Sequence, residues 1–179
     1  MHELLRPDSE LFRFGPEFIV LLLNWRDLGL SDVCENGLAV EAISRVTEAW
    51  QAAIDRTSAQ VIQLSFSPPP QDAYYELSSS MIAGRARTIR RINETLLQRA
   101  PVRVTLIDSE RIASSDAGPW EDSISWSSTK IYPAPRVLPS VAEHLVSCIR
   151  GELGLTRKLL VLDLDNTLWG GVVGEDGLA

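Results

Sequence analysis

Four short runs of apolar residues stand out along the chain, and each predicts a buried β-strand. Every run has the length of a strand, and the runs are rich in Val, Ile and Leu. Strands that are covered on both faces form nearly continuous apolar runs of this kind, as in parallel sheets. The four runs occupy residues 18–23, 61–65, 102–107 and 159–162.

Between these runs, apolar residues recur every three or four positions, which predicts amphipathic helices. The apolar stripes cover residues 43–54, 81–96 and 138–149. Arg85 interrupts the second stripe, and Pro139 stands near the start of the third, where a helix tolerates proline. Because strands and helices alternate, we expect an α/β fold: an open parallel sheet with flanking helices and right-handed crossovers.

Two loops and one boundary complete the predicted organisation. The Pro-rich residues 67–70 and the Trp- and Ser-rich residues 113–135 are expected to be loops. The second ends in Tyr132-Pro-Ala-Pro135, which favours extended or turning backbone. A boundary just before the last strand divides the chain into predicted domains 1–152 and 153–179.

Composition and charge narrow the function classes. Of the 179 residues, 45% are hydrophobic, enough for a sizeable core, and the formal net charge of −7 argues against general binding to nucleic acid or anionic membranes. Two distant cysteines argue against a disulfide framework or a zinc site. Residues 1–14 show no signal peptide, and the run 18–23 is too short to span a bilayer. We therefore expect a cytoplasmic protein with no nucleic-acid or membrane partner.

Two carboxylates, Asp163 and Asp165, follow the last apolar run and precede a Gly-rich turn. Residues two apart on a strand point to the same side, and ligands bind at the carboxyl ends of parallel strands. Mg²⁺ relieves the repulsion between such carboxylates and commonly accompanies a phosphate, which a carboxylate can attack. The residues alone leave a second interpretation open, in which both aspartates end the strand and cap the turn at Asn166 and Thr167.

The longer string is more specific than the aspartate pair. Residues 163–168, Asp-Leu-Asp-Asn-Thr-Leu, resemble the DxDxT motif of the haloacid dehalogenase (HAD) superfamily, and residues 164–177 resemble the FkbH-like branch. The resemblance implies that Asp163 is the nucleophile and Asp165 the general acid/base. It also implies that Mg²⁺ is held by Asp163 and the main-chain carbonyl of Asp165. Phosphate binding or the flap over the phosphate would use Asn166, Thr167, Trp169, Gly170 and Gly171.

An upstream segment extends this resemblance. Trp126-Ser-Ser-Thr-Lys130 followed by Pro133 resembles the segment that precedes the phosphatase domain of FkbH-like proteins. The three earlier strands are compatible with the SGNH-hydrolase-like domain that these proteins carry. The family takes a glyceryl unit from 1,3-bisphosphoglycerate, a phosphorylated three-carbon acid, and removes phosphate. It then loads the acyl group onto a phosphopantetheinylated acyl carrier protein for polyketide extender units.

The sequence also departs from the family. The remaining HAD motifs should follow the first one, and the sequence ends at Ala179, so we expect the 179-residue chain alone to be a poor phosphatase. Whether it is a fragment of a longer protein stays open. Leu159 stands where the family usually has Cys. Of the other thiols, Cys148 is expected to be a core residue and Cys34 an ordinary loop thiol.

An SGNH esterase is not supported. The sequence has no Gly-Asp-Ser, its two histidines are His2 and His144, and no Asp-x-x-His is present. Asn24, just past the first strand, is expected to be a turn or cap residue.

Five arginines concentrate basic charge in the second predicted helix: Arg85, Arg87, Arg90, Arg91 and Arg99. This pattern is typical of a solvated helix face. The alternative is that Arg87, Arg90 and Arg91 dock an acidic carrier protein or substrate phosphates, because guanidinium groups suit both. Trp120 and Trp126 are compatible with a pocket for the prosthetic arm of a carrier or with a packed loop.

Three hypotheses follow. The first is an FkbH-like phosphatase and glyceryl transferase that uses Mg²⁺. The second is a truncated, non-catalytic module that binds an acyl carrier protein or a separate phosphatase subunit. The third is a gene remnant with no function of its own.

Overall fold

A computed structural model describes residues 2–69, 72–115 and 119–156. The chain divides into two compact units, Met1–Val146 and Ser147–Ala179. Only residues 147–156 of the second unit are described. The predicted fourth strand, residues 159–162, therefore lies outside the described residues.

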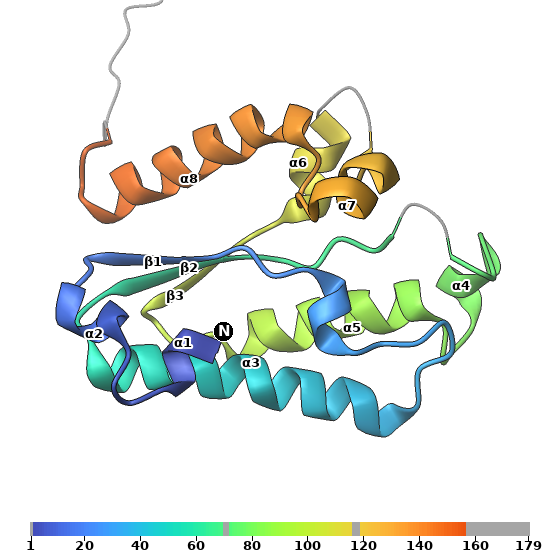
Figure 1. The fold of residues 1–179 in the computed structure, drawn as a ribbon, viewed down its shortest axis with the longest axis horizontal. Coiled ribbons are helices and arrows are strands. Elements are labelled where there is room, and N and C mark those ends of the chain that lie inside the picture. The colour runs from blue at the N-terminus through green and yellow to red at the C-terminus, as the bar shows by residue number, and fades with distance from the viewer. Residues whose placement is uncertain (1, 70–71, 116–118, 157–179) are drawn as a thin grey trace, which may run out of the picture. The chain divides into compact units, whose positions relative to one another are not determined.

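The first unit is built on a parallel sheet whose strands follow the chain order. Strands β1 (Phe18–Leu21), β2 (Gln60–Leu64) and β3 (Val104–Ile107) lie in the order β1-β2-β3, as Figure 1 shows. Val20 lies beside Ile62, and Ile62 beside Thr105. The first three predicted strands and the parallel α/β class are confirmed.

Helices of very different length connect and cover these strands. The two long connections of the sheet are α3, between β1 and β2, and α5, between β2 and β3. The helical elements are α1 (His2–Leu5), α2 (Glu10–Phe14), η1 (Trp25–Leu28), α3 (Asn36–Arg56), α4 (Leu77–Ser80), α5 (Arg85–Arg99), α6 (Ser109–Ser115), α7 (Ser123–Thr129), η2 (Pro135–Val137) and α8 (Leu138–Glu152).

Two sequence-based predictions about these helices are wrong in detail. The stripe over residues 81–96 is not one helix, because Met81 is the extended residue that caps the end of α4 and α5 begins only at Arg85. Residues 113–135 are not wholly a loop, since they contain α7. The carboxylate of Asp122 accepts hydrogen bonds from the backbone N–H groups of Ile124 and Ser125, which starts this short helix.

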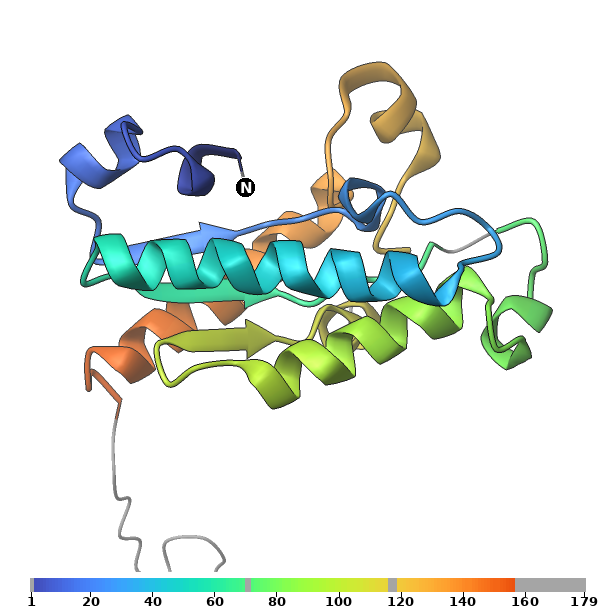
Figure 2. The same ribbon diagram turned by 90° about the horizontal axis from the view of Figure 1, so that it is seen from below.

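The main core lies between the sheet and helices α3 and α5, which run along the same face (Figures 1 and 2). The apolar stripe of α3 and that of α5 supply fully buried side chains, among them Val46 and Ile92. One buried polar pair crosses this core: the indole Nε1–H of Trp50 donates to Oε1 of Gln63 at 2.7 Å. The packing explains why both helices carry a strict apolar period.

A second, smaller cluster forms where β2 and β3 end. It is made by Leu64, Ile112, Trp120, Ala134, Val137 and Val141. These residues come from the end of β2, from α6, from the segments on either side of α7 and from the first turn of α8. The cluster therefore fixes the loops at the carboxyl edge of the sheet, where ligands bind in parallel α/β folds.

No helix in the described part of the chain combines the length and apolar character needed to cross a membrane.

Gly84 is expected to be irreplaceable for a steric reason. A Cβ atom at this position would overlap the backbone carbonyl group of Ser78, and backbone cannot move aside as a flexible side chain would. We expect Gly84→Ala to lower the free energy of unfolding by about 1–3 kcal/mol, as overpacking does. Gly37→Ala, in the first turn of α3 with open space around it, should be neutral or raise stability by up to about 1 kcal/mol. Urea unfolding of both variants checks this, and equal effects would contradict it.

Candidate functional site

The residues of the DxDxT string lie outside the described residues. This applies to Asp163, Asp165, Asn166, Thr167, Trp169, Gly170 and Gly171, whose roles stay predictions. Across residues 2–69, 72–115 and 119–156, no group of three or more His, Cys, Asp or Glu side chains could hold a metal ion.

One hollow, the Trp25–Arg85 hollow, lies past the carboxyl ends of β1 and β2. Its volume is about 450 Å³. Its walls come from η1, the loop after β2, the start of α5 and the segment before α7. The lining residues are Trp25, Arg26, Pro69, Arg85, Pro119, Glu121, Asp122 and Ser123.

A buried carboxylate joins two walls of this hollow. Glu121 is 8% exposed. Its Oε2 accepts a hydrogen bond from the indole Nε1–H of Trp25 at 3.1 Å, and its Oε1 accepts one from Arg26 at 2.5 Å. A buried carboxylate is tolerated only when it is paired and hydrogen-bonded, and both conditions hold here.

Cations and indole rings alternate beside Glu121 to form a cation–aromatic stack. The guanidinium of Arg26 lies over the rings of both Trp25 (4.3 Å) and Trp126 (4.6 Å). The guanidinium of Arg85 lies 4.5 Å from the centre of the Trp25 ring, and Lys130 Nζ lies 5.2 Å from that of Trp126. Trp126 and Lys130, the residues of the upstream resemblance, are thus linked to η1 and to the start of α5.

Arg85 interrupts the apolar stripe because it belongs to this hollow. Its side chain is 12% exposed and pairs with Asp32 at 2.6 Å. Its Nε–H is buried and has no hydrogen-bond acceptor among the described residues. Burial of an arginine at a helix start is unusual, and here the Trp25 ring and the Asp32 carboxylate offset its desolvation.

Asn24 caps the turn after β1, as the sequence predicts. Its side-chain oxygen accepts from the backbone N–H of Arg26 at 3.0 Å, and Asp27 accepts from the backbone N–H of Asn24 at 2.9 Å. This reciprocal pair is a capping box, and it orients the two residues that line the hollow.

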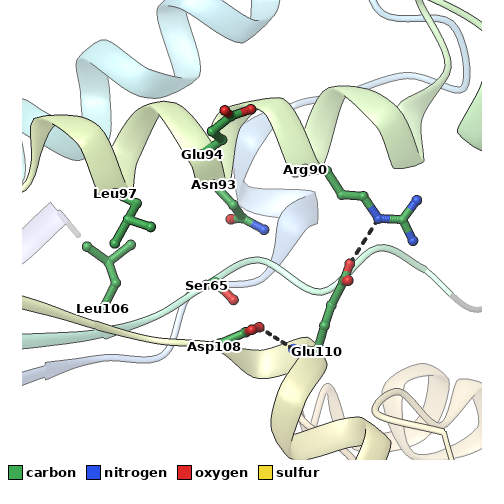
Figure 3. A pocket seen from close by; sticks show the side chains of 8 residues that line it. All are labelled: Ser65, Arg90, Asn93, Glu94, Leu97, Leu106, Asp108 and Glu110. Carbon is green, nitrogen blue, oxygen red and sulfur yellow. Dashed lines mark hydrogen bonds and ion pairs between the residues drawn. The ribbon is translucent and has the colours of Figure 1, made fainter.

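A second hollow, the Arg90 hollow, lies between α5 and the ends of β2 and β3 (Figure 3). Its volume is about 380 Å³, and its lining is Ser65, Arg90, Asn93, Glu94, Leu97, Leu106, Asp108 and Glu110. Leu97 and Leu106 face each other at one end, while Arg90 pairs with Glu110 at 3.3 Å at the other. Three carboxylates against one guanidinium disfavour a phosphate in this hollow.

The polar groups around the Arg90 hollow are bonded to neighbouring segments of the chain. Asn93 brackets the loop after β2: its Oδ1 accepts from the Phe66 N–H at 2.9 Å, and its Nδ2 donates to the Phe66 carbonyl at 2.8 Å. The hydroxyl of Ser65 accepts from the Ser109 N–H at 2.9 Å. Asp108 accepts from the Glu110 N–H at 3.0 Å at the start of α6. These groups hold loops in place.

The three arginines predicted to dock a carrier protein are all exposed on α5. Arg87 donates to the Ser80 carbonyl at 3.0 Å, and Arg90 donates to the Ser79 hydroxyl at 3.2 Å as well as pairing with Glu110. Arg91 is exposed on the same helix. The structure thus ties two of them to the segment before α5, and their docking role stays a prediction.

The two tryptophans considered for a carrier-arm pocket have different surroundings. Trp120 is 5% exposed and packs edge-on against Tyr132, with ring centres 6.4 Å apart, so it is a core residue. Trp126 belongs to the cation–aromatic stack. Tyr132, the ring against which Trp120 packs, is buried as well, and burial raises its pKa to about 12.

The cysteines depart from the sequence-based predictions in opposite directions: Cys34 is more buried than an ordinary loop thiol, and Cys148, expected to be a core residue, is only half-buried. Cys34 is in a loop, as expected, but it is 1% exposed and its thiol donates to the Ser31 carbonyl at 3.1 Å. Cys148 is half-buried on α8. Burial raises the pKa of both thiols, which lowers their thiolate fraction and their reactivity at neutral pH.

Sequence reasoning missed the main components of the Trp25–Arg85 hollow. Trp25 and Glu121 are separated by 96 positions, and neither belongs to a recognised motif. Two local signals pointed to the hollow: the Asn24–Asp27 capping pattern directly after a strand, and an arginine inside an apolar stripe. Their partner could not be found locally, because Glu121 stands in a stretch without periodicity.

Because the phenol of Tyr132 is buried, we expect the fold to lose stability as the pH rises through the alkaline range. Its folded-state pKa of about 12 lies above the ordinary value of 10.0, so the folded protein keeps the phenol proton where the unfolded chain loses it. The resulting stability is complete below pH 10 and declines by about 2–3 kcal/mol as the pH rises to 12. Urea unfolding should show this decline in the wild type but not in Tyr132→Phe. The control Tyr74→Phe, at an exposed position, should keep the wild-type decline.

Comparison with known proteins establishes similarity at the level of fold. No protein-family model matches the chain, and no curated protein sequence matches it. A solved structure with a similar fold is the N-terminal part of the protein BF1531 from Bacteroides fragilis, which contains a phosphatase domain and is complexed with Mg. The TM-score is 0.74 at 20% identity, over 98% of this chain and 48% of the other. The chain thus spans about half the length of that structure and shares its fold.

Proposed function

We propose that the chain belongs to a Mg²⁺-dependent phosphatase of the HAD type, to which it contributes the α/β unit and the first catalytic motif. The observation that carries the proposal is the Asp163-Leu-Asp165-Asn-Thr167 string in a chain with this fold. The protein of similar fold, BF1531, contains a phosphatase domain complexed with Mg. Two independent features, a motif and a fold, therefore favour the same chemistry.

The proposed chemistry assigns one role to each aspartate. The carboxylate of Asp163 attacks the phosphorus atom and forms an aspartyl-phosphate, and Asp165 moves a proton to the leaving group and later from water. Mg²⁺ supplies charge neutralisation at the phosphate. The resemblance to the HAD superfamily implies that the Mg²⁺ ligands are Asp163 and the main-chain carbonyl of Asp165, oxygen donors of the kind that Mg²⁺ prefers.

The finer proposal is an FkbH-like activity. The enzyme takes the glyceryl unit of 1,3-bisphosphoglycerate, releases phosphate and loads the acyl group onto a phosphopantetheinylated acyl carrier protein. Support comes from the string over residues 164–177 and from Trp126 and Lys130 of the upstream segment. The SGNH-like character of the N-terminal unit is part of this proposal.

Replacement of the nucleophile tests the chemistry. We expect Asp163→Asn to reduce Mg²⁺-dependent phosphate release from 1,3-bisphosphoglycerate by roughly a thousandfold or more, because an amide cannot form the aspartyl-phosphate. The assay uses the protein as its own host produces it, and chelation of Mg²⁺ should abolish the same signal. Asp8→Asn, at an exposed surface ion pair, serves as the control and should be fully active. Unchanged phosphate release in Asp163→Asn would exclude the proposed nucleophile.

A second candidate function is a non-catalytic module that binds an acyl carrier protein or a separate phosphatase subunit. It is favoured by Arg87, Arg90 and Arg91, which are exposed on one helix of a protein with net charge −7. Carrier proteins of this kind are acidic, and guanidinium groups pair well with carboxylates.

Binding measurements separate the two functions. Replacement of Arg87, Arg90 and Arg91 by Gln should weaken binding of an acyl carrier protein about tenfold or more at low salt, while Asp163→Asn should leave it unchanged. Replacement of Arg13, Arg111 and Arg150, also exposed, changes the net charge equally and should have little effect. Equal weakening by both triple variants would show that net charge alone is responsible. Titration calorimetry provides the affinities.

A further inference from the structure

The Trp25–Arg85 hollow has the location of a ligand site but is not used by the chemistry proposed for Asp163. It lies just past β1 and β2, where ligands bind in open α/β sheets. Its volume of about 450 Å³ is in the range of small-molecule sites. Its lining combines one indole and two proline rings with four charged side chains, so it is more polar than most small-molecule sites and suits a charged ligand group.

Two guanidinium groups in its wall are held rigidly. Arg26 is stacked between two indole rings and bonded to Glu121, and Arg85 is stacked on Trp25 and bonded to Asp32. A guanidinium carries five N–H donors, and one carboxylate satisfies at most two of them. The indole rings fix the orientation of both guanidinium groups. Each guanidinium has more N–H donors than its carboxylate partner can accept.

An unsatisfied donor points to the same conclusion. The Nε–H of Arg85 is buried without an acceptor among the described residues, and so is the side-chain NH₂ of the neighbouring cap, Asn24. Buried donors are almost always paired in proteins, with protein, water or a ligand. Both orphaned groups are donors with almost no accessible surface, so an acceptor would reach them only after a small movement of the surrounding side chains.

The surrounding charges permit an anion. The carboxylates near the hollow are each bound: Glu121 to Arg26, Asp32 to Arg85, and Asp122 to the start of α7. Hydrogen bonds from the Ser125 hydroxyl and from the backbone N–H groups of Ile124 and Ser125 lower the pKa of Asp122, so it stays ionised. The lining holds two cations, Arg26 and Arg85, against the carboxylates of Glu121 and Asp122, and the neighbours Lys130 and Arg136 are matched by Asp27 and Asp32, so the region is close to neutral.

We propose that the Trp25–Arg85 hollow binds the phosphate or carboxylate group of a small molecule, with Arg85 and Arg26 as its principal donors. This proposal does not depend on the phosphatase proposal. Carboxylate and phosphate groups each present two oxygens that can accept parallel hydrogen bonds from one guanidinium. The indole and proline faces of the hollow would contact the body of the ligand.

The indole N–H of Trp25 gives a direct readout, since it donates to Glu121 in the wall of the hollow. We expect saturable shifts of its ¹⁵N–¹H resonance when inorganic phosphate or acetate is titrated at constant ionic strength, with chloride as the reference. The stronger of the two probes identifies the preferred group. Shifts with phosphate and acetate that only follow chloride, without saturation, would overturn the proposal.

Variants of Arg85 make the test specific. Arg85→Met keeps an aliphatic chain over Trp25 but removes the donors, and it should weaken binding of the preferred probe at least tenfold. Arg99→Met, at the exposed end of α5, is the matched control and should bind like the wild type. Asp163→Asn should also bind normally, which separates this site from the phosphatase chemistry.

A third variant covers the case in which Arg85→Met does not fold. Arg85→Lys keeps a charge for the ion pair with Asp32 but lacks the planar fork and Nε–H, so it should fold and bind the probe several-fold more weakly. Wild-type affinity in a folded Arg85→Met or Arg85→Lys protein would show that Arg85 does not contact the ligand, contrary to the proposal.

Discussion

The buried carboxylate of Glu121 holds the carboxyl edge of this fold together. It joins a turn that follows the first strand to a segment almost one hundred residues later, through Trp25 and Arg26. Removing one partner of a buried ion pair typically costs about 3–5 kcal/mol, because the other charge is left without compensation. The hydrogen bonds to Glu121 also fix the Trp25 ring, so the cation–aromatic stack and the Trp25–Arg85 hollow both depend on this one side chain.

The two hollows at the carboxyl edge differ because their polar groups are used differently. Around the Arg90 hollow, Asn93, Ser65 and Asp108 bond to backbone groups of adjacent loops, and the remaining carboxylates outnumber the single guanidinium. In the Trp25–Arg85 hollow, the guanidinium groups of Arg26 and Arg85 stack on the Trp25 ring. The Nε–H of Arg85 has no acceptor among the described residues. The same sheet edge thus has one region whose polar groups stabilise loops and another in which two buried donors have no acceptor among the described residues.

The chain combines two functional regions with different support. The string around Asp163 carries the proposed phosphoryl chemistry through its sequence, whereas the Trp25–Arg85 hollow is defined by its geometry. The similarity in fold to the N-terminal part of BF1531, at 20% identity, links the α/β unit to a protein that contains a phosphatase domain. Trp126 and Lys130 contributed to the family resemblance through their spacing, and in the structure they extend the cation–aromatic stack that includes Arg26, a residue of the hollow.

Local patterns in the sequence determined a large part of this protein. The apolar runs identified the three described strands, the 3.6-residue period identified α3, α5 and α8, and Asn24 capped its turn as expected. These features depend on neighbours within a few positions, so they can be read without the fold. The DxDxT string is likewise local, but its chemistry is implied by the resemblance to the HAD superfamily, because the residues alone leave a capping role open.

Other features of this protein depend on residues that are distant in the sequence, and only the tertiary structure determined them. The start of α5 at Arg85 follows from the close approach of Gly84 to Ser78, and the burial of Cys34 follows from packing of its loop into the main core. Neither Glu121 nor Arg85 stands in a pattern that reveals its partner, because Trp25 and Asp32 are brought to them only by the folded sheet and helices. Periodicity reports which face of an element is buried, but it carries no information on which charged group will meet another across the fold.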